Sequence, residues 1–436
     1  MKPRALLILL LSPVLLTACG PEDPDKDGVA GTRDKCPTVA AKTKDGCPAE
    51  KNISSVNFYL ETSASMGGYY KGSTFRDVVS DLLTKIDKNI HPVEIFTTAE
   101  RTEKFAGSPQ QFSSEIARVA ISPQKSSQLH KIIENIAAKN ESGGISLLIS
   151  DCILSFPDAD IKRDREINRN NASSTLKSNI FATFADLRKR GIGASIYAFK
   201  SAFNGTYYDY QNNKIQLSGT QRPFYVWVIG ETALLQKFNA QLRDISSFKP
   251  EKELHFGGTE SAVADYDVIP QVERQGSWMK TQDGIKDVEL KKGEGMQAAL
   301  GVDLSALPAY AQEVDYLQEN LQVQTTGCTA TITVKKKSSA DRSKLKSQPQ
   351  IEDFEKASHI FLLKVSDMPL ADATVTYKLP LRYDTWYQAW SCMDDKNLVA
   401  NCAGKTFAFE HLVNGVREAY EAKNNFYVDG VVKLSK

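Results

Sequence analysis

Residues 56–68 have the sequence VNFYLETSASMGG, in which an apolar-rich segment runs directly into a polar turn. The first six residues carry mainly apolar and aromatic side chains, which predicts a β-strand. This strand ends at Glu61, and hydroxyl side chains follow at Ser63 and Ser65. A segment with helical periodicity begins soon after Gly67 and Gly68. Glu61, Ser63 and Ser65 are therefore expected where a strand passes into a helix.

Strands and helices alternate downstream of this turn. Apolar residues recur at helical spacing over residues 75–86, 129–136, 176–187 and 234–245. Strands are predicted at residues 93–98, 103–106 (an edge hairpin), 145–150, 194–199 and 224–229. This alternation predicts an α/β domain over residues 53–257 with a doubly wound, mostly parallel sheet. Such sheets bind ligands at the carboxyl ends of their strands, and the central strand ends in Ser150 and Asp151.

The turn E-T-S-A-S at residues 61–65, together with Asp151 after the central strand, resembles the metal-ion-dependent adhesion site (D-x-S-x-S) of a von Willebrand factor A domain. The order of elements across residues 53–257 is similar as well. The resemblance implies that Ser63 and Ser65 bind magnesium or manganese through their hydroxyls. It further implies that Asp151 provides a second carboxylate, often through water, and that Ser127 takes the place of the threonine in the middle loop.

Glu61 departs from this family, which has aspartate at the position. Magnesium demands near-octahedral ligands at about 2.0–2.1 Å. The extra methylene of Glu61 therefore requires a displaced strand, a direct bond in place of a water bridge, or a site without metal. In the alternative interpretation, Ser63 and Ser65 only cap the loop, while Glu61 accepts backbone hydrogen bonds at a helix N-terminus.

Two further segments are expected above the same edge of the sheet. Residues 155–171 form a polar, charge-dense insertion after Asp151, which is either a binding loop or a solvated loop. Residues 203–210 contain three tyrosines. They form either a surface that recognises proteins or sugars or a hairpin packed on the domain.

The N-terminus has the features of a cleaved secretion signal. Lys2 and Arg4 give a basic start, and the apolar residues 5–16 are too few to span a bilayer stably. The ending L-T-A-C at residues 16–19 resembles the lipobox of bacterial lipoproteins. This implies that residues 1–18 are removed and that Cys19 carries acyl chains such as palmitate, which would anchor the chain in the cell envelope. We expect the anchor to lie in the outer membrane of a Gram-negative bacterium. The acidic stretch close behind Cys19 is compatible with display on the outer face of that membrane. The alternative is a plain signal peptide with a free Cys19.

An acidic loop lies in the segment 19–52. Counting from Asp23, acidic residues occupy positions 1, 3, 5 and 12 and glycine occupies position 6, so that alternate carboxylates converge on one calcium ion. The predicted calcium ligands are Asp23, Asp25, Asp27, the carbonyl of Val29, and Asp34. The continuation C-P-T at residues 36–38 and D-G-C-P at residues 45–48 resembles the thrombospondin type 3 repeat of bacterial surface lipoproteins, which implies this ligand set and a disulfide. The alternative is a flexible acidic tether that binds ions loosely.

Seven cysteines are compatible with an oxidising compartment. With Cys19 assigned to lipid, two close pairs suggest disulfides, and Cys152 and Cys328 are then either free or joined. The two pairs are Cys36 with Cys47 and Cys392 with Cys402.

Helical periodicity fades after about residue 258. Strands are predicted at residues 285–290, 301–305, 321–324, 330–335, 359–365, 373–379 and 426–434. They favour a mainly antiparallel, β-sandwich-like domain over residues 258–436. Residues 335–350 predict an exposed loop, and residues 407–420 predict an amphipathic helix. Trp386 and Trp390 form either a ligand platform or part of the core. No family resemblance emerges in this half.

Composition and motifs restrict the function. The net charge is +1 with both signs spread along the chain, so nucleic acid is not an expected partner. Neither G-x-S-x-G nor G-x-x-x-x-G-K occurs, and the five histidines have no spacing that predicts a catalytic base. We expect a non-enzymatic, envelope-anchored lipoprotein that binds a protein or glycan through the altered adhesion site. The alternatives are a metal-independent structural subunit of an envelope assembly and a hydrolase with Thr62, Ser63 or Ser65 as nucleophile.

Overall fold

The structure is a computed structural model that describes residues 28–33, 42–44, 52–118, 121, 129–139, 142–154, 169–257, 262–281, 284–290, 293–305, 307–421 and 426–436. The chain forms two compact units, Met1–Asn52 and Ile53–Lys436. In the first unit, the described residues include one turn of 3-10 helix, η1 (Gly31–Arg33).

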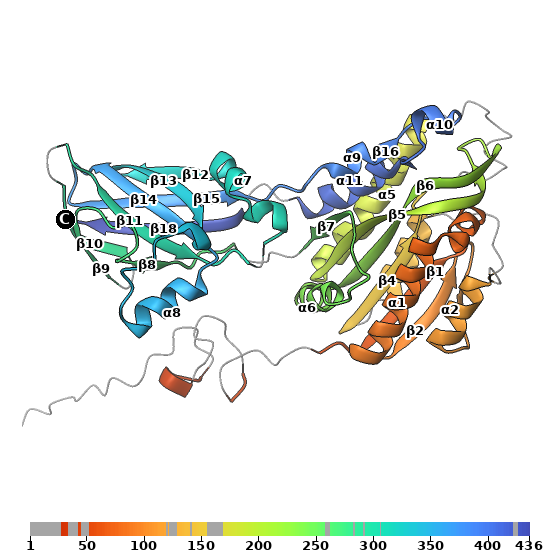
Figure 1. Ribbon diagram of the computed structural model, residues 1–436, viewed down its shortest axis with the longest axis horizontal. Coiled ribbons are helices and arrows are strands. Elements are labelled where there is room, and N and C mark those ends of the chain that lie inside the picture. Colours follow the sequence, from red (N-terminus) through yellow and green to blue (C-terminus); the bar gives the residue numbers. More distant parts are fainter. Residues whose placement is uncertain are drawn as a thin grey trace, which may run out of the picture. The chain divides into compact units, whose positions relative to one another are not determined.

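The second unit begins with a seven-stranded sheet (Figure 1). Its strands are β1 (Ser55–Glu61), β2 (Val93–Thr98), β3 (Thr102–Lys104), β4 (Gly144–Ser150), β5 (Ile192–Tyr208), β6 (Lys214–Glu231) and β7 (Lys252–Phe256), in the order β3-β2-β1-β4-β6-β5-β7. β1 pairs in parallel with β2 and β4, whereas β6 runs antiparallel to both β4 and β5. β3 and β7 are antiparallel edge strands. The mixed α/β architecture and the parallel strands β2, β1 and β4 confirm the prediction of an α/β domain with a parallel part in its sheet.

The connection between β5 and β6 differs from a doubly wound pattern. β5 continues to Tyr208, and a turn at residues 209–213 leads directly back into β6. The sequence offers no helix between the two strands, and consecutive strands without a crossover helix pair antiparallel. Phe203, Tyr207 and Tyr210 are buried. The tyrosine-rich segment is therefore the packed hairpin of the two alternatives.

Helices cover both faces of the sheet (Figure 1). They are α1 (Ser73–Asn89), α2 (Pro109–Ala117), α3 (Leu129–Lys139), α5 (Arg169–Lys189), α6 (Thr232–Arg243) and α11 (Phe409–Tyr420). Alternate residues of a strand point to opposite faces. Phe58 and Leu60 accordingly share an apolar cluster with α1, α2 and α6, whereas Tyr59 joins a second cluster with α3, α5 and α11.

The N-terminus of α1 is fixed against β5. The amide of Phe75 donates to Ser201 Oγ at 3.2 Å. A Cβ atom at Gly72 would lie 2.3 Å from that same oxygen and 2.4 Å from the carbonyl oxygen of Ala202, so only glycine allows this approach. The short 3-10 helix η2 (Ala64–Lys71), which directly follows β1, is held between the strand and α1 by this contact.

A segment near the C-terminus completes the second apolar cluster. α9 (Trp386–Ala389), β16 (Ser391–Cys392), α10 (Leu398–Asn401) and β17 (Thr406–Phe407) precede α11. α11 packs on α5 so closely that a Cβ at Gly415 would lie 2.6 Å from the carbonyl oxygen of Lys177. Trp386 and Trp390 are buried in this cluster, which makes them core residues. We call the described residues of 53–257 and 386–420 the α/β lobe. Side chains of the two segments pack in the same apolar clusters, so this lobe extends beyond the predicted domain boundary at residue 257.

The remaining residues form a β-rich lobe, which comprises the described residues of 262–381 and 426–436. One sheet has the order β12-β15-β18-β10-β9 and the other β13-β14-β11-β8, and all pairs are antiparallel except β10 with β18. The strands are β8 (Asp267–Ile269), β9 (Ser277–Lys280), β10 (Gly284–Glu289), β11 (Met296–Val302), β12 (Gln322–Thr326), β13 (Thr329–Lys336), β14 (His359–Asp367), β15 (Asp372–Pro380) and β18 (Phe426–Ser435). Residues of both sheets meet in one apolar cluster.

Short helices connect these strands. They are η3 (Ala309–Gln312), α7 (Val314–Asn320), η4 (Lys337–Ser339) and α8 (Gln348–Lys356). α8 begins within the polar segment predicted as a loop, because Ser347 and Gln350 form a capping box at its start. In the part of the chain that the structure describes, no helix combines the length and apolar character needed to cross a membrane.

Candidate functional site

The carboxyl ends of β1 and β4 bring the predicted site residues together. The two strands are parallel neighbours, with Leu60 opposite Ile149, so Glu61 and Ser150 lie side by side. Ser63 Oγ and Ser65 Oγ are 3.0 Å apart in the turn that follows β1. Asp151 follows β4 at the same edge. We call Glu61, Thr62, Ser63, Ser65, Ser150, Asp151 and Arg222 the strand-end cluster.

Asp151 lies at the centre of this cluster. It is 1% exposed, and its Oδ1 accepts from the amide of Ile153 at 3.2 Å. The chain leaves β4 through Cys152, whose φ of 54° is left-handed and turns the backbone so that this amide reaches the carboxylate. Asp151 Oδ2 has no hydrogen-bond partner among the described residues. Burial, and then the nearby Glu61 carboxylate, raise the pKa of Asp151 to about 7, against the opposing effects of Ile153, Ser65 and Arg222.

Glu61 is directed at the neighbouring strand. Its Oε2 accepts a short hydrogen bond from Ser150 Oγ, and that hydroxyl accepts from the amide of Cys152 at 2.8 Å. The Tyr70 hydroxyl donates to the Glu61 carbonyl at 3.3 Å. The longer side chain of glutamate thus reaches β4, which is how this chain accommodates the extra methylene relative to aspartate.

Arg222 supplies a positive charge to the cluster that the sequence analysis did not identify. It lies on β6, is 0% exposed, and is close enough to Asp151 to oppose the rise in that residue's pKa. Its Nη2 donates to the carbonyl of Lys405 at 3.1 Å and its Nη1 to that of Cys402 at 3.4 Å. Its guanidinium lies 4.3 Å from the centre of the Tyr207 ring, a cation–π distance.

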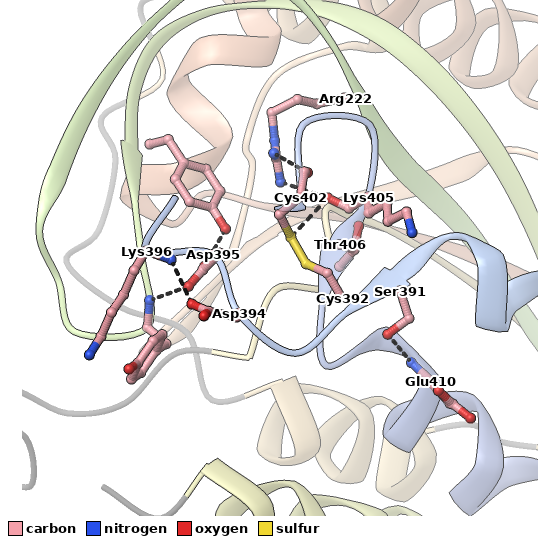
Figure 2. Close-up of a disulfide and its surroundings, with 12 residues drawn as sticks. Arg222, Ser391, Cys392, Asp394, Asp395, Lys396, Cys402, Lys405, Thr406 and Glu410 are labelled. Atoms are coloured by element: carbon pink, nitrogen blue, oxygen red, sulfur yellow. Dashed lines mark hydrogen bonds between the residues drawn. A yellow bond between two sulfur atoms is a disulfide. The ribbon is translucent and has the colours of Figure 1, made fainter. Parts of the chain in front are cut away.

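The disulfide loop between β16 and β17 provides these carbonyls (Figure 2). Cys392 and Cys402 form the predicted pair. Asp395, within the loop, accepts from the Tyr207 hydroxyl at 2.6 Å and from the Tyr210 amide at 3.1 Å. Figure 2 shows Arg222 reaching the loop beside the two cysteines. The loop therefore holds both the Arg222 guanidinium and the Tyr207 ring that this guanidinium stacks on.

The donor set of the strand-end cluster fits a divalent cation. Oxygen ligands suit magnesium and manganese, and the site offers the Ser63 and Ser65 hydroxyls and the open oxygen of Asp151. Thr62 Oγ1 is also buried, with no partner in the part of the chain described. Within that part, no group of three or more histidine, cysteine, aspartate or glutamate side chains could hold a metal, so any cation here depends on hydroxyl ligands.

Several predicted site residues lie outside the described part of the chain. Ser127 is one of them, as are Cys19 and the predicted pair Cys36–Cys47, and most of the insertion at residues 155–171. Of the predicted calcium ligands, only Val29 is described; the others are Asp23, Asp25, Asp27 and Asp34. The question left open for Cys152 and Cys328 is answered, because both are free.

Comparisons with known proteins identify no relative. No family model, no curated protein and no solved structure matches this chain.

A second polar cluster lies on the opposite side of β6 from β4, and the sequence analysis missed it. Ser195 on β5 and His255 on β7 are direct cross-strand partners, with Ser195 Oγ 2.8 Å from His255 Nδ1. Asn239 on α6 donates to the same hydroxyl at 2.8 Å. We call Ser195, Asn239, His255 and Glu253 the cross-strand cluster. A pairing between β5 and β7 would have been needed to predict it, and the short β7 carries little strand signal.

Proposed function

We propose that the α/β lobe is a von Willebrand A-like binding domain of an envelope-anchored lipoprotein. In this proposal, Ser63, Ser65 and Asp151 hold a magnesium or manganese ion, and a protein or glycan ligand binds at that edge of the sheet. The β-rich lobe is proposed to be a β-sandwich-like domain, the Cys19 lipid to be the anchor, and the calcium loop to stiffen the segment between them. The observation that supports the binding site most directly is the buried Asp151 Oδ2, which has no hydrogen-bond partner among the described residues and lies at the same sheet edge as the two hydroxyls.

Five residues of the cluster have a role in this proposal. The bound cation would supply a coordination position for an acidic group of the ligand. The two serine hydroxyls and the Asp151 carboxylate, which must be ionised, bind the cation. Glu61 and Ser150 keep the ends of β1 and β4 together, and thereby keep the hydroxyls beside Asp151. No residue is assigned the role of nucleophile, so we propose binding without turnover.

Thermal unfolding in magnesium or manganese tests the site. A ligand at 100 times its dissociation constant stabilises the folded state by about 2.7 kcal/mol. We expect the melting temperature of the full chain to rise by several degrees in millimolar metal. The rise should be absent in Ser63→Ala and Asp151→Asn, and should persist in the control Ser55→Ala, which changes a serine at the other end of β1. Equal responses in all four proteins would disprove the site.

Arg222 favours a second candidate, a metal-independent structural subunit. A fully buried guanidinium already places one positive charge near Asp151. In this alternative the nearby guanidinium charge takes the place of the cation, and the wild-type protein shows no metal-dependent shift. Arg222→Met distinguishes the two: it should create a magnesium response if the guanidinium replaces the metal, and should leave an existing response in place if it does not.

Cys19→Ser tests the anchor separately. In cells labelled with a radioactive fatty acid, we expect label in the wild-type chain and none in the variant. Label that persists in the variant would contradict the assignment of Cys19.

A further inference from the structure

The two ends of the disulfide Cys392–Cys402 differ in exposure. Cys392 is partly exposed and lines a surface hollow of about 390 Å³ together with Asn401 and Lys405. Cys402 is only 1% exposed and packs in one of the apolar clusters of the sheet. A thiolate opens a disulfide by attacking one of its two sulfurs, and the other sulfur then leaves. The difference in exposure makes Cys392 the sulfur that a reductant reaches and Cys402 the leaving group.

The surroundings of Cys402 suit a leaving sulfur. Arg222 Nη1 donates to the Cys402 carbonyl at 3.4 Å, which places a fully buried positive charge beside this residue. A nearby cation favours the thiolate, and a thiol that ionises easily leaves faster. The carbonyl oxygen of Lys405 lies 4.0 Å from Cys402 Sγ and provides an acceptor for the thiol once it is protonated. Both the charged and the neutral form of the leaving group therefore have a partner.

The loop that the disulfide closes, with the residues directly after it, contacts the strand-end cluster. Figure 2 shows Arg222, Asp395 and Thr406 around the disulfide. Two loop carbonyls accept from Arg222, and Asp395 accepts from the Tyr207 ring hydroxyl. Thr406 Oγ1 donates to the Asp151 carbonyl at 3.4 Å. The cross-link joins residues ten positions apart, and a cross-link stabilises mainly by restricting the chain. Opening it therefore loosens these contacts together.

We infer that this disulfide is a redox switch, opened at Cys392 by a dithiol, that releases the loop from the strand-end cluster. One thiolate of the dithiol attacks Cys392 Sγ and forms a mixed disulfide, while Cys402 leaves and takes up a proton. The second thiol then displaces Cys392, so the dithiol is oxidised to a disulfide and both cysteines are reduced. Two electrons and two protons pass from the dithiol to the protein. In the reduced chain, the acceptors of Arg222 are no longer held in place.

Trapping of the mixed disulfide on the native full chain tests the point of attack. Lys396 lies between the two cysteines, so trypsin separates them into the peptides 383–396 and 397–405. The probe is glutathione, a monothiol that has no second thiol to complete the reduction. After brief exposure, acid quenching and alkylation of free thiols, we expect at least tenfold more glutathione on peptide 383–396 than on peptide 397–405. An equal distribution, or reaction only in denaturant, would overturn the inference.

Hydrogen exchange tests the release of the loop. The Thr406 amide donates to the Trp390 carbonyl and the Ala408 amide to the Cys392 carbonyl, both at 2.9 Å, so these amides report on the loop. After reduction with dithiothreitol, a dithiol, amides of residues 397–408 should exchange at least tenfold faster. Amides of β1 should keep their rates. Unchanged exchange at residues 397–408 in the reduced protein would overturn the inference.

Two variants assign the change to this disulfide. The double variant Cys392→Ala, Cys402→Ala should exchange like the reduced wild type, with or without dithiothreitol. Cys328→Ala removes a free thiol and should respond to dithiothreitol as the wild type does. A double variant whose exchange still accelerates in dithiothreitol would show that another disulfide controls the loop, which contradicts the inference.

One consequence rests on the proposed function. Once Arg222 loses its acceptors, its positive charge is no longer held beside Asp151, so magnesium should bind the reduced protein at least fivefold more tightly. The magnesium concentration at half the shift in melting temperature, with and without dithiothreitol, measures this. If magnesium shifts neither form, the proposed cation site fails, and hydrogen exchange still decides the switch. If it shifts both forms at the same concentration, the switch does not reach the strand-end cluster and the inference fails.

Discussion

The strand-end cluster and the cross-strand cluster both lie in the α/β lobe, yet their hydrogen-bond partners come from different parts of the chain. The strand-end cluster contains two carboxylates and a guanidinium, and the two carbonyls that accept from this guanidinium lie 180 and 183 residues from Arg222 in the chain. The cross-strand cluster is built from neighbouring strands and one helix. The comparison shows that charged groups buried at a strand edge take partners from a distant part of the chain, whereas a largely neutral cluster takes its partners from adjacent strands and a helix.

The largest expected effect is the loss of the guanidinium. Arg222→Met leaves the Cys402 and Lys405 carbonyls without their donor and Asp151 without its nearby positive charge, and should destabilise the protein by about 3–5 kcal/mol. Urea unfolding followed by circular dichroism measures this. Arg243→Met removes an arginine whose side chain is 58% exposed, and should change stability by less than about 1 kcal/mol. Similar changes in the free energy of unfolding for Arg222→Met and Arg243→Met would show that the buried guanidinium of the strand-end cluster has no special weight.

Removing the disulfide should have a smaller effect on the same cluster. The double variant Cys392→Ala, Cys402→Ala frees the loop that holds Arg222, and should cost about 2–4 kcal/mol. Urea unfolding of the oxidised wild type and the double variant gives the difference. Cys328→Ala is the control, because this thiol is free and partly exposed. If the double variant were as stable as the control, the loop would not support the strand-end cluster.

The cross-strand cluster should be less sensitive. Ser195→Ala removes the hydroxyl shared by Asn239 and His255 and should cost about 1–2 kcal/mol, the usual loss for a buried hydrogen-bonded group. Ser114→Ala, which removes an exposed hydroxyl on α2, should cost less than about 0.5 kcal/mol. If Ser195→Ala lowered the free energy of unfolding as much as Arg222→Met, the two clusters would not differ in their sensitivity to mutation.

The smallest effect concerns pH. Burial raises the pKa of Asp395, with partial opposition from the Tyr207 and Tyr210 hydrogen bonds. The folded state therefore binds this proton more tightly than the unfolded state, so wild-type stability should fall as pH rises from about 4 through the folded pKa. Asp395→Asn lacks this ionisation, and its stability relative to wild type should increase between pH 4 and pH 7. Urea unfolding at both pH values measures the change, and a constant difference would contradict it.

Much of the α/β lobe could be predicted because its strands and helices carry strong local patterns. The convergence of Ser63, Ser65 and Asp151 followed from one rule, that parallel neighbours end at the same edge. Arg222 could not be predicted in this way. Arg222 lies in the middle of β6, which runs antiparallel to β4, and not at the end of a parallel strand. Which residue of β6 reaches the cluster depends on the length of the β5–β6 hairpin.

The cross-strand cluster and the C-terminal segment escaped prediction for a related reason. Ser195 and His255 become neighbours only through the pairing of two strands whose register the sequence does not reveal. α11 was predicted as an amphipathic helix, but its apolar stripe gives no indication of which surface it covers. Contacts between distant segments of the chain decide both cases.

The packing of α11 on α5 also has a consequence for the order of folding. Gly415 fits against a helix more than 220 residues earlier in the chain, and the surface that it covers is apolar. Until residues 386–420 have been synthesised, the part of this apolar cluster that α11 covers, including the side of α5 that contacts it, lacks its cover, and contacts of such high sequence separation form slowly. The α/β lobe therefore acquires its complete core only late in synthesis, and a chain that ends before residue 386 should expose apolar surface that favours aggregation.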